Sequence, residues 1–278
     1  MKKITLLLLA ILAVNSAVGQ KKEKLKGSKI VTIEQKQVDA FDGLEVQDNL
    51  SISLIKGDKN GIELEADDNL QNSLSISMNG SVLILGAAQE VSGFKKYNIR
   101  VTYTDSFKSV VAKGKSKINA LEEIKIEEIS FHAWDDATLY LNVGAKSFSL
   151  ISNDKSHAEI NAKTESSRIE LSKNATLKAL ISSTQLTCDL YQKGNANIEG
   201  DVIDMKLRLD NNSNFNGKKL TVKNLQLTAE GYSNCSVLAD TTISIEAIGN
   251  SEIEFYGEAK PELKKFSDSA KLLKKPIK

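Results

Sequence analysis

Charged side chains that could support acid–base chemistry recur between residues 168 and 208. They fall into two rows of regular spacing: Arg168, Asp189 and Lys206, then Glu170, Tyr191 and Arg208. Pectin-cleaving β-helix enzymes use clustered acids and a basic residue on an outer sheet face. Here the sign alternates along each row, so basic neighbours are expected to keep each acid ionised, whereas a catalytic carboxylate pair needs separated pKa values. We therefore predict a stabilising charge ladder and no catalytic residue.

A second group of side chains could bind a ligand without chemistry. His132, Trp134 and Tyr140 stand close together in the sequence, beside Asp135 and Asp136, and Trp134 is the single tryptophan. Exposed aromatic rings beside polar groups are common anchors for a sugar or a protein partner. The alternative is that Trp134 folds over a turn and covers a neighbouring coil. His132, Trp134 and Tyr140 are our candidate ligand-binding residues.

Metal and nucleophile chemistry have little support in the sequence. The two histidines are His132 and His157, and no Cys/His cluster has zinc spacing. The acidic runs 67–69 and 135–136 lack the spaced oxygen pattern of a calcium loop and read as solvated turn acids. No phosphate-binding loop, dinucleotide fingerprint or Gly-x-Ser-x-Gly motif is present. We expect no metal and no cofactor.

The elements that position these side chains are set by a repeat. Small residues open a strand after each Gly, Asn, Asp or Lys turn, at nearly regular intervals along the chain. A period of about 19 residues indicates one structural unit per turn of a solenoid. The eight anchors are Ser116, Ala137, Ser156, Ala175, Ala196, Ser213, Ser233 and Ser251.

The residues two positions after and six positions before each anchor are apolar, and they alternate with polar residues. This pattern is typical of strands with one row of side chains pointing inward. Residues 108–257 therefore predict an all-β fold, a right-handed parallel β-helix of about eight coils of about 19 residues. Residues 30–107 predict a hairpin-rich β region packed on the helix, because Asn79-Gly80 lies between alternating strands. Residues 258–278 are expected to be a C-terminal cap and basic tail, with both prolines after the last coil.

The segment 1–19 has the features of an export signal. Lys2 and Lys3 precede an apolar run over residues 4–14, and small residues follow at 17–19. The run is too short to span a bilayer, so the mature protein is expected to contain no integral membrane segment. We predict an exported protein that is periplasmic, outer-membrane-associated or secreted.

The net charge and the two cysteines bear on the class of partner and on the presence of a disulfide. The chain has 37 basic and 36 acidic residues, a net charge of +1, which argues against a nucleic-acid partner. Cys188 and Cys235 are the two cysteines of an exported chain, but the repeat places them on different coils and in apolar rows. Because a disulfide needs Cα atoms within about 7 Å, we predict two free, buried thiols.

Several stretches of the mature chain carry a family resemblance. The packing and turn residues of segments 41–46, 51–54, 56–58, 62–68 and 83–85 resemble the opening of the head GIN domain family of bacterial auto-transporter adhesin heads. Segments 97–120 and 248–275 fit the family pattern as well. The resemblance implies an all-β exported protein with an adhesin role, and it supplies no catalytic motif.

These observations predict a non-enzymatic, exported β-helical surface or periplasmic protein with an adhesin-like binding or presentation role. Its partner would be a glycan or a protein surface, and the oligomeric state is open. One alternative is a polysaccharide-active β-helix enzyme. The other is a purely structural component of the cell envelope.

Overall fold

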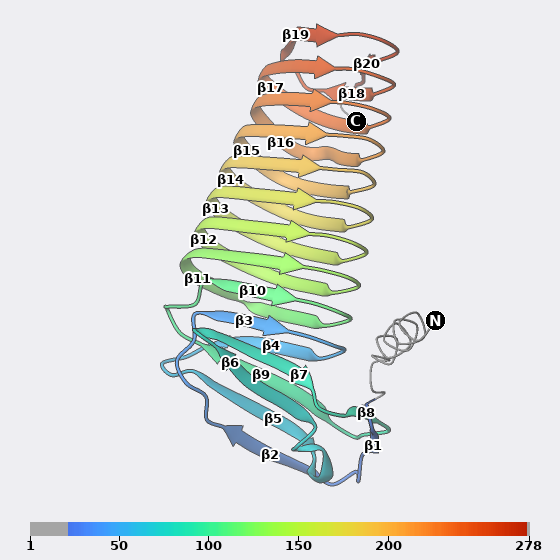
Figure 1. The fold of residues 1–278 in the computed structure, drawn as a ribbon. Helices are drawn as coiled ribbons and strands as arrows, with labels where there is room; N and C mark the ends of the chain where they lie inside the picture. The colour runs from blue at the N-terminus through green and yellow to red at the C-terminus, as the bar shows by residue number, and fades with distance from the viewer. Residues whose placement is uncertain (1–21, 277–278) are drawn as a thin grey trace, which may run out of the picture.

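The computed structural model describes residues 22–276, so the predicted signal at 1–19 lies outside the described residues. The chain forms a right-handed parallel β-helix of about nine turns, which confirms the predicted all-β fold (Figure 1). In the described part of the chain, a single 3-10 turn, Asp68–Leu70, interrupts the strands. Within residues 22–276, no helix is long and apolar enough to cross a membrane.

Seven long strands form the body of the helix, and each pairs in parallel with the next. They are β11 (Lys117–Ala133), β12 (Thr138–Ser152), β13 (His157–Leu171), β14 (Thr176–Leu190), β15 (Asn195–Leu209), β16 (Asn214–Ala229) and β17 (Asn234–Ala247). Backbone hydrogen bonds between coils hold successive strands ~4.8 Å apart, so equivalent residues lie directly above one another.

Each long strand bends in the middle and contributes to two sheet faces. In β13 the buried side chains are Ala158, Ile160 and Ala162, then Ser167, Ile169 and Leu171. The change from even to odd numbers marks the bend, where none of residues 163–166 is buried. We call the outward side of the first halves, such as 157–163, the first face, and that of the second halves, such as 166–171, the second face. The apolar core lies between them.

The turn between the two faces is stacked from coil to coil. Its first residue has a left-handed backbone, with φ of 59° at Asp154, 56° at Lys173 and 58° at Gln192. The residue that follows donates a backbone hydrogen bond to the turn below, as from Asn174 N to Asp154 O over 2.8 Å. Asp and Asn tolerate this conformation better than Lys and Gln, so turns with a longer side chain store strain.

The fifth turn corrects the sequence prediction. We expected Gly194 to adopt the left-handed conformation before an anchor at Ala196, but Gln192 does so and Gly194 occupies the anchor position. Leu177 pairs with Ala196, which is therefore two positions past the anchor. The glycine misled the prediction because glycine is the usual left-handed residue. With Gly194 as the anchor, the intervals to Ala175 and to Ser213 become equal.

Anchor positions require small side chains because they are fully enclosed. Ala137, Ala175 and Ser213 are each 0% exposed, and the other serine anchors are buried as well. The hydroxyl oxygens of Ser116, Ser213, Ser233 and Ser251 have no hydrogen-bond partner within residues 22–276. Small size is therefore the property that the anchors share, since among the serine anchors the hydroxyl of Ser156 alone makes hydrogen bonds within residues 22–276, to Ser152 and Asn153.

The N-terminal region combines hairpin pairing with one further coil. Its strands are β1 (Lys24–Lys26), β2 (Val31–Lys36), β3 (Gly43–Val46), β4 (Ser51–Lys56), β5 (Gly61–Asp67), β6 (Leu74–Asn79), β7 (Val82–Ala87), β8 (Glu90–Ser92), β9 (Tyr97–Tyr103) and β10 (Ser109–Ala112). The Asn79-Gly80 hairpin is confirmed by antiparallel β6 and β7. However, β3 and β4 pair in parallel with β10 and β11, so this part of the expected hairpin region is a coil.

The C-terminal residues also stack as strands. β18 (Glu252–Tyr256) pairs with β17, and β19 (Lys260–Phe266) and β20 (Lys271–Lys274) stack in parallel on β17 and β18. Pro261 lies inside β19 and not after the last coil, which corrects the prediction. A proline is tolerated there because β19 pairs with β17 on one side, and no strand of the described residues pairs with its other edge.

Both cysteines are free and buried, as predicted. Cys188 stacks between Ile169 and Leu207 on the second half of its coil. Cys235 pairs with Phe215 on the first half of β17. Burial raises the pKa of each thiol above its ordinary value, because the apolar core disfavours the thiolate.

The register of the fifth turn predicts that two substitutions change the free energy of unfolding in opposite directions. Gln192→Gly should raise the free energy of unfolding by up to ~1 kcal/mol, because glycine adopts the left-handed conformation without strain. Gly194→Ala should lower it by ~1–3 kcal/mol, because the new Cβ would lie 2.9 Å from the carbonyl oxygen of Leu171. Urea unfolding of both variants measures the two changes. Stabilisation by Gly194→Ala would contradict this register.

Candidate binding grooves and charged clusters

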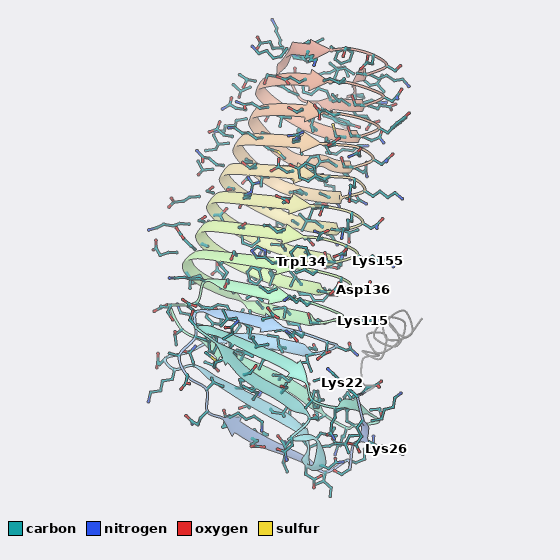
Figure 2. All side chains as sticks on the ribbon, viewed as in Figure 1. Lys22, Lys26, Lys115, Trp134, Asp136 and Lys155 are labelled. Atoms are coloured by element: carbon teal, nitrogen blue, oxygen red, sulfur yellow. The ribbon has the colours of Figure 1, made fainter. Side chains whose placement is uncertain are left out.

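The structure separates the three predicted ligand-binding residues. Tyr140 is half-buried in the first half of β12 and faces outward on the first face. His132 is half-buried at the end of β11 on the second face, and burial lowers its pKa. Trp134 lies in the turn between them, half-buried (Figure 2). His132 and Tyr140 thus face outward on different faces, and Trp134 lies at the edge that joins them.

Tyr140 lines a groove on the first face, which we call the Tyr140 groove. Its volume is about 530 Å³. Two outward rows of side chains form its floor. Parallel pairing places one residue of each row on each successive coil. The rows are Tyr140, Glu159 and Lys178, then Asn142, Asn161, Leu180 and Glu199.

The polar groups of the Tyr140 groove are only partly satisfied by the protein. Asn161 Nδ2 donates to Asn142 Oδ1 over 3.2 Å, and the remaining amide atoms of the pair make no hydrogen bond within residues 22–276. Lys178 forms no ion pair among the described residues, and Leu180 is 52% exposed. Lys117 Nζ lies 5.6 Å from the centre of the Tyr140 ring. The groove therefore offers an aromatic ring, an apolar side chain and free amide groups together.

We did not identify the amide pair from the sequence. The signal was present, because Asn142, Asn161, Leu180 and Glu199 follow one another at a constant interval of one coil. Neutral amides are common at outward positions, so their residue type alone does not mark a site.

A larger groove of about 820 Å³ lies on the second face, toward the C-terminal end. Its lining consists mainly of uncharged polar side chains and scattered charges, without an aromatic residue from the described part of the chain. The lining includes Gln185, Thr187, Asp204, Lys206, Asn224 and Gln226. Asn224 both donates to Asp204 over 2.9 Å and accepts from Thr242 over 2.9 Å, so part of this surface is satisfied internally.

The charge ladder predicted for residues 168–208 has a different composition. Because the fifth turn is shifted by two positions, Glu170 pairs with Asp189, and Arg168 pairs with Thr187. Two acids therefore lie on consecutive coils, where we expected alternating signs. Arg168 Nη2 holds both, 3.5 Å from Glu170 and 3.3 Å from Asp189. Stabilising ion pairs are thus present as predicted, but a single arginine, Arg168, makes both of them, in place of an alternating row of charges.

Asp189 is the most perturbed acid of this cluster. Burial raises its pKa, and the opposing effect of Arg168 does not fully compensate, while Glu170 adds repulsion. Tyr191 is not part of the paired row, which corrects the prediction: Asp189 pairs with Arg208, and Tyr191 follows the end of β14 with Arg208 5.9 Å from its ring centre. Arg208 in turn pairs with Glu230 at 3.4 Å. The charges of Arg168, Glu170, Asp189, Arg208 and Glu230 are thus paired internally, which favours stability, whereas Lys206 lies between Thr187 and Gln226 without an ion pair among residues 22–276.

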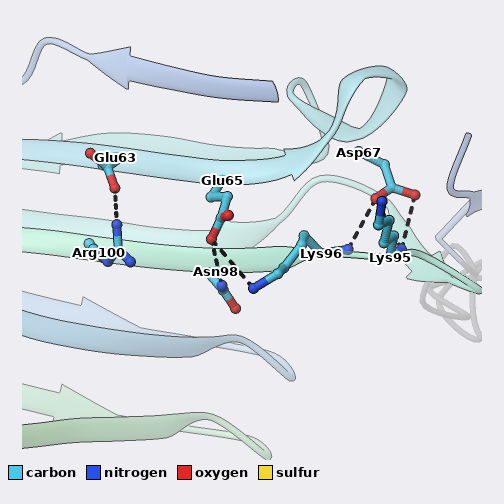
Figure 3. A network of polar contacts seen from close by, with 7 residues as sticks. All are labelled: Glu63, Glu65, Asp67, Lys95, Lys96, Asn98 and Arg100. Carbon is cyan, nitrogen blue, oxygen red and sulfur yellow. Dashed lines mark hydrogen bonds and ion pairs between the residues drawn. The ribbon is translucent and has the colours of Figure 1, made fainter. Parts of the chain in front are cut away.

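Asp67 organises the N-terminal region (Figure 3). Its side chain is 0% exposed, which corrects our expectation of a solvated turn acid. The carboxylate accepts backbone N–H groups from Lys29 at 2.8 Å, Lys95 at 3.0 Å and Lys96 at 3.1 Å. Burial alone would raise its pKa, but these hydrogen bonds outweigh burial and lower it. Asp67 therefore fixes two loops, at 27–30 and 93–96.

Glu254 is the centre of a network on the first face near the C-terminal end. Lys218 Nζ lies 3.0 Å and Lys275 Nζ 3.5 Å from its carboxylate, and Ser236 Oγ donates to it over 2.9 Å. The contacts with Lys218 and Ser236 lower the pKa of Glu254 to about 2. The carboxylate therefore strongly favours its ionised form in the folded protein.

Comparison with known proteins gives a family and a fold. Residues 40–259 match the family profile described as "Putative auto-transporter adhesin, head GIN domain". No curated protein matches the chain.

Three solved structures from Parabacteroides are similar in fold. A "putative adhesin" of Parabacteroides distasonis has a TM-score of 0.65 at 15% identity, covering 90% of this chain and 99% of its own. A "putative adhesin" of Parabacteroides merdae has a TM-score of 0.53 at 16% identity, covering 91% and 100%. A "Putative lipid binding protein" of Parabacteroides distasonis has a TM-score of 0.59 at 14% identity, covering 92% and 97%. At these identities the likeness shows the fold alone.

The Glu254 network predicts an acid-dependent loss of stability. Its folded-state pKa of about 2 lies below the ordinary value of 4.5, so its contribution is present above pH ~4.5 and lost as the pH falls toward 2. Glu254→Gln should therefore flatten the dependence of unfolding free energy on pH between 4.5 and 2. Glu246→Gln is the control, because Glu246 is exposed and forms no ion pair among residues 22–276. Identical acid curves for wild type and Glu254→Gln would refute this role.

Proposed function

The chain belongs to the head GIN domain family of auto-transporter adhesin heads, and on that premise we propose that it is an exported, non-enzymatic recognition protein that binds a glycan. Export is supported by the signal features of residues 1–19. The mature protein would act at the cell surface, in the periplasm or after secretion.

The observation that carries this proposal is the composition of the Tyr140 groove. A sugar ring presents an apolar face of C–H groups and a rim of hydroxyls. Tyr140 and the exposed Leu180 offer apolar contact, and the free amide atoms of Asn142 and Asn161 can donate to and accept from hydroxyls. An aromatic anchor beside unpartnered polar groups is the usual composition of a specific binding site.

The spacing of the groove favours an extended chain over a single sugar. Its two rows repeat at each coil, ~4.8 Å apart along the helix axis. That distance is close to the repeat of one sugar unit in an extended polysaccharide. A glycan lying along the axis would therefore meet equivalent positions at successive units. Trp134 and His132, around the turn, would contact a partner that extends past the edge of the first face.

The surface acids support binding over catalysis. A glycosidase needs two carboxyl groups with different protonation, free to reach the substrate. Glu170 and Asp189 are the neighbouring pair, and Arg168 engages both of them. In the Tyr140 groove, Glu199 pairs with Lys219 at 3.3 Å and Glu159 contacts His157 at 3.3 Å. These acids are suited to orienting hydroxyls as hydrogen-bond acceptors.

A glycan array followed by titration tests the proposal. The array should contain neutral, amino-sugar and uronic-acid polysaccharides, and the best-bound glycan is then titrated by calorimetry. Tyr140→Ala and Asn161→Ala should each weaken binding about tenfold, or ~1.4 kcal/mol. Gln226→Ala, in the groove of the second face, is the matched control and should leave the affinity unchanged.

A reducing-sugar assay on the same glycans separates the competing functions. Binding without release supports a recognition protein. Release of reducing ends would show a polysaccharide-active enzyme. If the protein neither binds nor cleaves a glycan, the remaining function is that of a structural envelope component. If Gln226→Ala alone loses binding, the site lies on the second face.

A further inference from the structure

A cavity at the joint between the N-terminal region and the first stacked turns belongs to neither groove. Its volume is about 570 Å³, within the range of small-molecule sites. The small sheet of β1 and β8 forms one wall. The turns that follow β3 and β10, at residues 48–50 and 114–115, form the other. We call it the Phe94 pocket.

The interior of the Phe94 pocket is largely apolar. Leu50 and the half-buried Val91 line it, and the rings of Phe94 and Tyr97 pack against each other with centroids 5.6 Å apart. Phe94 nevertheless remains 41% exposed. An aromatic side chain left partly in water gains free energy when a ligand covers it, because more apolar surface is then removed from water.

Phe94 is held in this position by fixed backbone contacts. The buried carboxylate of Asp67 accepts the N–H groups of Lys95 and Lys96, which directly follow Phe94. Gly27 allows the neighbouring loop to close, because a Cβ there would lie 2.7 Å from the Cα of Phe94. The exposed ring is therefore part of a preorganised wall.

The opposite wall is fixed by Asp48. Its carboxylate accepts the N–H of Ala87 over 2.8 Å and pairs with Lys22 Nζ at 2.6 Å. Its carbonyl oxygen accepts the N–H of Lys115 over 2.6 Å. Two carboxylates on separate loops thus fix the backbone of the two walls.

The charges around the pocket leave one cation without a partner. Lys22 neutralises Asp48, and Lys24 lies 3.6 Å from Glu90. Lys115 lines the pocket and forms no ion pair among residues 22–276. Lys22 and Lys115 lie on the same turn-side edge of the molecule (Figure 2). A ligand with an anionic group would complete the rim.

We propose that the Phe94 pocket binds a single-chain amphiphile, with its alkyl chain against Phe94, Val91 and Leu50 and its carboxylate at Lys115. The site is separate from the Tyr140 groove and does not rest on the proposed glycan function. A charge-assisted hydrogen bond from Lys115 would favour a carboxylate over a neutral or cationic head.

Calorimetric titration of the chain from Gln20 onward with laurate, below its micelle concentration, tests the site. We expect saturable binding with one site per chain, and about tenfold weaker binding or none for dodecyltrimethylammonium, which has an alkyl tail of nearly the same length and the opposite charge. Lys115→Gln and Phe94→Ala should each weaken laurate binding about tenfold. Lys155→Gln is the matched control, because Lys155 occupies the equivalent turn position two coils further on.

Phe94→Leu keeps an apolar side chain and serves as a second variant in case Phe94→Ala does not fold. It should retain most of the affinity for laurate, and its thermal unfolding midpoint should match that of the wild type. The proposal is overturned by a lack of saturable laurate binding, or by equal binding of both amphiphiles. It is also overturned if Phe94→Ala and Lys115→Gln bind as wild type does, because the ligand would then lie elsewhere.

Discussion

The vertical stacking of one turn on the next is the constraint on which the rest of this structure depends. Each turn begins with a residue in the left-handed conformation and donates a backbone hydrogen bond to the turn below. That geometry fixes where the following strand begins, and so fixes which side chains point inward along its whole length. No coil can bury its apolar row alone, because the row is covered only by the opposite half and by neighbouring coils. A change in the register of one turn would therefore displace side chains on both faces of the helix.

Much of the fold follows from the sequence because this constraint leaves a periodic trace. Apolar residues two positions after an anchor lie inward at every coil, and a shift of two positions preserves that parity. For this reason the misplaced fifth anchor left the core prediction intact. The outward rows do not share this tolerance, since a shift of two positions changes which charge stands beside which. The alternating ladder inferred from Arg168 and Asp189 was wrong, while the inward rows around it were correct.

The two ends were harder to predict, and the reason is physical. A strand's alternation shows that it has a buried side, but it does not show whether its neighbour runs parallel or antiparallel. β4 looks like half of a hairpin in sequence, yet it pairs in parallel with β9 and β11, which lie far along the chain. Asp67 likewise looks in sequence like one of several turn acids. Its burial depends on N–H groups from two loops that only the tertiary fold brings together.

A rigid ladder also determines where function can arise. Inward positions are fixed by packing, and many outward charges are engaged by a neighbour on the same strand or one coil away, as Arg168 engages Glu170 and Asp189. Such pairs are formed whether or not a partner is present, so they contribute little to selecting one. The groups able to discriminate between partners are those that the stacking leaves unsatisfied, and these include the amide pair near Tyr140 and the cation at Lys115. Because the backbone beneath them is held by hydrogen bonds on both sides, these groups are already oriented before a ligand arrives, and little conformational entropy is lost on binding.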